Sequence, residues 1–92
     1  MVIEFDPAKD AANQKKHGVS LELAADFDLR RVLTHPGSSA QGEARTQVIG
    51  DIGGTVYTAI VTERGGTLRI ISVRRASRKE RQQYERTIRH TG

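Results

Sequence analysis

Alternating apolar and polar positions predict strands in the second half of the chain. Residues 55–62 read TVYTAIVT and residues 68–73 read LRIISV, and both runs are rich in β-branched residues. Such residues suit a pleated, half-buried surface. The turn Arg64-Gly65-Gly66 between them is typical of a hairpin. We expect further strands at residues 2–5, 31–35 and 42–50, with a turn at 51–54 and a polar loop at 36–42.

Capping signals predict three helices. Asp6 as N-cap and Pro7 at the first helical position begin one helix, and Gly18 ends it. Ser20 begins a second, shorter helix over residues 21–27, and Ser77 with Glu80 has the capping-box pattern of a third, which runs to about residue 89. The expected fold is α+β: two N-terminal helices packed on a small antiparallel β-meander of three or four strands, followed by a C-terminal helix.

Size and composition restrict the class of protein. A chain of 92 residues forms one domain, which we place at residues 1–92. The absence of cysteine excludes disulfides and thiolate metal sites. No apolar run approaches the roughly 18 residues of a membrane span, and the N-terminus lacks a secretory pattern. We therefore expect a cytoplasmic protein with no membrane association.

Positive charge is concentrated at the C-terminal end. Residues 74–92 contain seven basic and two acidic side chains, a net charge of +5, whereas the whole chain carries +4. Such a segment indicates attraction to a polyanion or to an acidic protein partner. A solvated helix face explains the same charges equally well.

The candidate chemistry is a group of bases with one acid. Histidines 17, 35 and 90 are scattered without metal-ligand spacing, so we expect no metal and no cofactor. RNA cleavage without a metal needs groups that accept and donate protons, and fixed positive charge on the phosphate. Arginine supplies that charge well because its guanidinium binds phosphate oxygens bidentately. The residues that fit these roles are Lys16, His17, Glu43, Arg45, Arg74 and Arg75.

Several of these residues also have a purely structural explanation. Lys16 and His17 lie in the last turn of the first helix, where cations oppose the helix dipole favourably. Glu43 and Arg45 lie two apart on one strand face, where they can pair with each other or across strands.

The other candidates are affected by strand alternation and by the last helix. Alternation sends Arg74 and Arg75 to opposite faces of the sheet, so we expect them to divide their roles. Glu80 is both a helix cap and a carboxylate that can orient one of these arginines. Tyr84 lies on the apolar line of the last helix, which indicates a core residue with a solvated hydroxyl group.

Three motifs occur in order along nearly the whole chain. The first is F-D-P-x-K-x-x-x-N-x-x-K-H-G-V over residues 5–19, and the second is G-E-x-R over residues 42–45. The third is R-I-I-S-x-R-R-A over residues 69–76, followed by Glu80 and Tyr84. In these motifs the chain resembles the BrnT toxins of bacterial type II toxin–antitoxin systems.

That resemblance implies a RelE-like microbial ribonuclease fold and a toxin that arrests growth as a metal-independent endoribonuclease, by attack of the ribose 2′-hydroxyl. It also implies neutralisation by a BrnA-type antitoxin with a ribbon-helix-helix part. The toxin would autoregulate its operon together with this antitoxin and would reach operator DNA only through it. The six candidates above match the expected active surface. We add Lys9, Asn13, Arg78 and Lys79 as RNA-binding residues, and Glu80 and Tyr84 as supporting ones.

The loop at residues 36–41 departs from the family pattern, because PGSSAQ replaces the usual acidic, aromatic-containing approach to the second motif. An alternative that needs no catalytic geometry is a basic module that binds a partner protein or nucleic acid.

Overall fold

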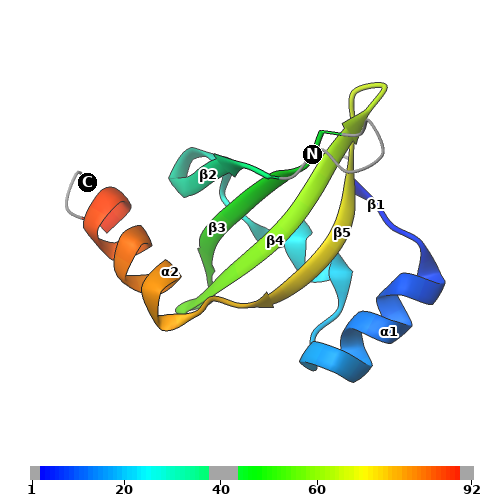
Figure 1. The fold of residues 1–92 in the computed structure, drawn as a ribbon, viewed down its shortest axis with the longest axis horizontal. Helices are drawn as coiled ribbons and strands as arrows, with labels where there is room; N and C mark the ends of the chain where they lie inside the picture. Colours follow the sequence, from blue (N-terminus) through cyan, green and yellow to red (C-terminus); the bar gives the residue numbers. More distant parts are fainter. Residues whose placement is uncertain (1–2, 38–43, 90–92) are drawn as a thin grey trace.

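The computed structural model describes residues 3–37 and 44–89, and its centre is a five-stranded sheet (Figure 1). Four strands pair in antiparallel fashion, and the short β1 pairs in parallel with the start of β5. The predicted α+β class is confirmed, and β1 adds a fifth, parallel strand to the four antiparallel ones. In the spatial order β1-β5-β4-β3-β2, the strands are β1 (Ile3–Glu4), β5 (Thr67–Arg75), β4 (Thr55–Arg64), β3 (Thr46–Ile52) and β2 (Val32–Pro36).

The first helix, α1 (Pro7–His17), begins and ends where the sequence predicts. The carboxylate of Asp6 accepts a hydrogen bond from the Ala8 amide at 2.8 Å, which satisfies one free N–H group of the first turn. Gly18 closes the helix in the left-handed conformation, with φ at 76°.

The prediction of a second N-terminal α-helix is wrong. Residues Leu21–Asp26 form a 3₁₀ helix, η1, which a second short 3₁₀ turn, η2 (Leu29–Arg31), follows. Leu21, Ala24 and Phe27 are buried at intervals of three residues. This interval matches the three residues per turn of a 3₁₀ helix, so the tighter helix places all three on the core.

The C-terminal helix begins with the predicted capping box of Ser77 and Glu80. Its α-helical part, α2 (Arg78–Tyr84), continues as a π-helical turn, η4 (Glu85–Arg89). Tyr84 is 2% exposed, and its hydroxyl group donates to the Arg31 carbonyl oxygen at 2.9 Å. Tyr84 is therefore a core residue, but its hydroxyl is bonded to the backbone rather than solvated.

Apolar side chains cover the two faces of the sheet unequally. On one face, η1 packs over the larger cluster, which includes Val48, Ala59 and Val73. On the other face, α2 and η4 cover only a small cluster around Ile49 and Tyr84. In Figure 1, α1 lies beyond β5 at one edge of the sheet, whereas α2 lies toward β3 and β2. The remainder of the α2 side is left for polar side chains.

Within the described ranges, the protein has no helix that is both long enough and apolar enough to span a membrane.

Candidate active site

Strand register gathers polar side chains on the side of the sheet that carries α2. Residues directly opposite each other on paired strands point to the same face. The pairs Thr58–Arg74, Gln47–His35 and Thr62–Arg69 therefore share this face, and Arg45 joins it because it precedes Gln47 by two residues. We call the following set the polar face: His35, Arg45, Gln47, Thr58, Thr62, Arg69, Ser72 and Arg74.

Arg74 is held on the polar face by Glu80. Its two terminal nitrogens donate to the two carboxylate oxygens of Glu80 at 2.7 and 2.9 Å, a bidentate ion pair. Gln47 and Thr58 donate to the same carboxylate at 2.8 and 3.0 Å. The Ser77 amide adds a bond at 2.8 Å. This network anchors the start of α2 to three strands.

The ion pair shifts the protonation equilibria of both partners. The Arg74 hydrogen bonds lower the pKa of Glu80 from 4.5 to about 2, against the opposing effect of its burial. The same bonds raise the pKa of Arg74. Glu80 therefore carries its negative charge at neutral pH and orients Arg74, as the sequence predicted for one of the two arginines.

Arg75 lies away from this network. It pairs with Tyr57, whereas Arg74 pairs with Thr58, so the two arginines point to opposite faces as alternation predicted. The Arg75 side chain is exposed. The structure consequently brings only Arg74 of this pair to the polar face.

The candidates on α1 lie in a groove at the free edge of β5. This groove of about 290 Å³ is bordered by Lys16, His17 and Lys9 on the helix, and by Ile71 and Ser72 on the strand. Ser72 belongs to the polar face through its pairing with Ile60. The α1 bases thus stand at the β5 edge of the polar face, separate from the Arg74–Glu80 network.

Asn13 has a structural role that its predicted RNA contact did not anticipate. Its amide nitrogen donates to the carbonyl oxygens of Val19 and Val73 at 2.9 and 2.8 Å. Its amide oxygen accepts from the Val73 N–H at 3.3 Å. Asn13 is 7% exposed and completes the unpaired edge of β5 where β1 has ended. Its polar atoms are thus bonded to the backbone, which gives Asn13 a structural role, and its contact with RNA stays a prediction.

Arg45 lies beside β2 at the other side of the polar face. Its carbonyl oxygen accepts from the Gly37 amide at 2.6 Å, and its Nε atom is buried with no hydrogen-bond partner among the described residues. The predicted partner Glu43 lies outside the described residues, so a pairing of the two stays a prediction. His35, which has no motif spacing in the sequence, lies on the same face because it pairs with Gln47.

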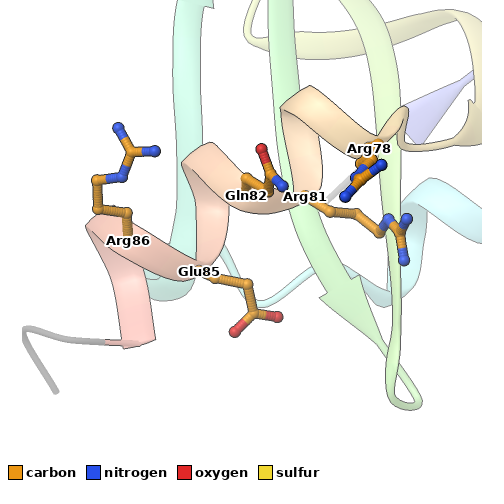
Figure 2. A pocket seen from close by; sticks show the side chains of 5 residues that line it. All are labelled: Arg78, Arg81, Gln82, Glu85 and Arg86. Carbon is orange, nitrogen blue, oxygen red and sulfur yellow. The ribbon is translucent and has the colours of Figure 1, made fainter.

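A second basic surface lies on the exposed side of α2 and η4 (Figure 2). Its shallow cavity of about 620 Å³ is bordered by Arg78, Arg81, Gln82, Glu85 and Arg86. Lys79 is exposed next to it on the same helix. The two predicted RNA-binding residues of α2 are therefore accessible, though they are not part of the polar face.

No group of three or more histidine, aspartate or glutamate side chains that could hold a metal ion occurs within residues 3–37 and 44–89.

The fold and the site define a small basic α+β domain whose sheet presents arginine and histidine side chains on one incompletely covered face. The family model described as "Ribonuclease toxin, BrnT, of type II toxin-antitoxin system" matches residues 5–80. The chain belongs to the BrnT family of ribonuclease toxins, as its three motifs predicted.

A solved structure supports the same assignment. The crystal structure of the Brucella abortus ribonuclease toxin BrnT is similar at 28% sequence identity and a TM-score of 0.67. The match covers 85% of this chain and 99% of the Brucella chain. A search of curated protein sequences found no match.

Proposed function

We propose that this chain is the toxin of a type II toxin–antitoxin system and that it cleaves RNA without a metal ion, in the cytoplasm, to arrest growth. The observation that carries the proposal is the family match over residues 5–80. The arginines on the polar face, which α2 covers only in part, support it. In the proposed reaction, the ribose 2′-hydroxyl attacks the adjacent phosphodiester and displaces the 5′-oxygen.

Fixed positive charge on the polar face supports phosphate binding there. Arg45 and Arg74 are both half-buried, and the Arg74 side chain remains 37% exposed beside its ion pair with Glu80. Preorganised cationic donors stabilise the charge that develops on the phosphate in the transition state. Arg75 points to the opposite face, so we assign it to contacts with the flanking RNA or with a partner.

Lys16 or His17 is the proposed proton-transfer group at the β5 edge, and Glu43 keeps its predicted role near Arg45. Lys9 borders the same groove, so it extends the positive surface along α1. Arg78 and Lys79 extend it along α2. RNA that crosses the polar face between the two helices would meet basic side chains on both sides.

The purified chain is expected to cleave RNA in the presence of EDTA as rapidly as in its absence. Arg45→Ala and Arg74→Ala should each lower the initial rate about 100-fold, because each removes a transition-state donor. Arg30→Gln is the matched control, since its side chain is 90% exposed on η2. Loss of cleavage in EDTA would contradict a metal-independent reaction. Wild-type rates in both arginine variants would contradict the proposal that Arg45 and Arg74 bind the phosphate.

The basic cavity on α2 favours a second candidate function, a module that binds nucleic acid or a protein without cleavage. Affinity for RNA would then fall steeply with salt, because each neutralised phosphate releases counterions. Tight, salt-dependent binding with intact RNA after prolonged incubation would support this candidate over the enzyme.

Co-expression with the product of the neighbouring open reading frame should yield a stable complex. Family membership implies an antitoxin, and we propose a BrnA-type protein whose ribbon-helix-helix part binds the operator, so that the toxin reaches DNA only through it. The measurement is co-purification, followed by operator binding with and without the toxin chain. A toxin that binds operator DNA alone would contradict the proposal.

A further inference from the structure

Two nitrogen atoms of the polar face are buried without a hydrogen-bond partner in the described part of the chain. They are Nε2 of His35 and Nε of Arg45. A buried polar atom that is left unsatisfied costs about 1–3 kcal/mol, and native structures contain few of them. The two atoms lie on adjacent strands, so we take them as one binding site in which a ligand supplies the missing hydrogen-bond partners.

The two side chains are neighbours through the register of β2 and β3. His35 is directly opposite Gln47, and Arg45 is two residues before Gln47 on the same face. Such diagonal neighbours have Cα atoms roughly 7–8 Å apart, which long side chains can span. The Gly37–Arg45 backbone hydrogen bond at 2.6 Å continues the pairing of the two strands past this point.

The two groups differ in the chemistry that they offer. The Arg45 guanidinium is a permanent cation that only donates hydrogen bonds, which suits a phosphate oxygen. Histidine is the side chain that ordinarily exchanges protons near neutral pH. One cationic donor beside one proton-transfer group is the pair that attack by a ribose hydroxyl on a phosphodiester needs.

The other charged groups on the polar face, and Glu80 beside it, cannot take the proton-transfer role. Arg69 and Arg74 remain cations, and Arg69 lies 3.7 Å from the exposed Glu4. Glu80 has a pKa of about 2 and already accepts hydrogen bonds from four residues. Of the described residues on this face, His35 is thus the one that leaves a basic nitrogen atom, Nε2, without a hydrogen-bond partner.

We propose that His35 is the general base of RNA cleavage and that Arg45 holds the phosphate on which it acts. The inference rests on the proposed ribonuclease function. Nε2 of His35 takes the proton of the 2′-hydroxyl as the 2′-oxygen bonds to phosphorus and the bond from phosphorus to the 5′-oxygen breaks. The leaving 5′-oxygen takes a proton from water, because Lys16 and His17 lie at the opposite edge of the sheet, and loss of the bound proton to water restores His35. Nε–H of Arg45 donates to a non-bridging oxygen throughout.

The decisive variant is His35→Gln, which keeps a polar side chain of similar size but cannot titrate. Its initial rate of RNA cleavage should fall about 100-fold or more, within the range for loss of a general base. The acidic limb of the pH–rate profile, where a base loses activity by protonation, should disappear. Circular dichroism and thermal unfolding verify that the variant folds.

The variant His17→Gln, made in parallel, tests whether the general base is His35 on β2 or His17 on α1. If His17→Gln removes the acidic limb while His35→Gln retains it, the base lies on α1 and the proposal is overturned. A wild-type chain that cleaves RNA, combined with an unchanged rate and pH profile in His35→Gln, overturns the base assignment alone. A wild-type chain that cleaves no RNA instead overturns the proposed function on which the assignment rests.

A binding measurement tests the phosphate site without catalysis. In protein labelled with ¹³C-histidine, inorganic phosphate and a 2′-O-methyl RNA oligonucleotide should both move the ring signal of His35, which is assigned by its loss in His35→Gln. Arg45→Gln should weaken this response several-fold. A shift confined to the His17 signal, or no shift in any ring signal, overturns the placement of the phosphate beside Arg45.

Discussion

Replacement of Glu80 by alanine is expected to lower the free energy of unfolding by about 3 kcal/mol at neutral pH. The Glu80 side chain is only 15% exposed. Its removal leaves Arg74, Gln47 and Thr58 without their shared acceptor, and it also removes the capping box of α2. A shift in pKa from 4.5 to about 2 corresponds to roughly the same energy, at about 1.4 kcal/mol per pKa unit. Denaturant unfolding at pH 7 measures this loss.

The same ion pair predicts how stability depends on pH. The folded pKa of Glu80 is depressed, so its contribution is fully present above about 4.5 and is lost as the pH falls toward about 2. The Glu80→Ala variant should lack this part of the acid dependence. Glu63→Ala is the matched control, because it removes an exposed carboxylate near the end of β4. Equal unfolding free energies for the two variants would contradict a stabilising role for the network.

Elements that depend on neighbouring residues could be read from the sequence. Asp6, Gly18 and Ser77 fix helix ends through bonds within a few residues of themselves, and these helix ends are as predicted. The opposite directions of Arg74 and Arg75 follow from alternation within one strand. The sequence also contained a signal for the 3₁₀ helix. The apolar residues Leu21, Ala24 and Phe27 recur strictly every three residues, whereas an α-helix would show intervals of both three and four.

Features that depend on pairing between distant segments could not be read in this way. Ile71 is an extra residue in β5, because Ile60 pairs with Ser72 and Val61 pairs with Ile70. This β-bulge places both Arg69 and Ser72 on the polar face, although they are an odd number of residues apart. Simple alternation would have assigned them to opposite faces.

The position of His35 follows from the same kind of long-range pairing. Its strand, β2, is joined to β3 through a loop whose length does not determine which residues stand opposite each other. Only the register of these strands shows that His35 faces Gln47 and lies diagonal to Arg45. A histidine without motif spacing therefore became a candidate site residue through topology rather than through its local sequence.

Asn13, in the first motif, is hydrogen-bonded to Val73 in β5, the strand that carries the third motif. Its replacement by aspartate is expected to lower the free energy of unfolding more than its replacement by alanine. Asn13→Ala removes three hydrogen bonds and leaves Val73 polar groups unsatisfied, with an expected loss of about 2–3 kcal/mol in unfolding free energy. Asn13→Asp places a carboxylate against the carbonyl oxygens of Val19 and Val73, so we expect a loss of about 3–4 kcal/mol.

The two variants should also differ in their response to acid. The buried carboxylate of Asn13→Asp favours its protonated form in the folded state, so its folded pKa lies above its unfolded one. Protonation then restores a donor, and stability relative to Asn13→Ala should rise as the pH falls through that raised pKa. Gln83→Glu, the same amide-to-acid change on the exposed side of α2, should show neither the loss nor this recovery. An Asn13→Asp protein as stable as the wild type at pH 7 would mean that the β5 edge tolerates charge there, and that Asn13 is free to serve the α1 groove after all.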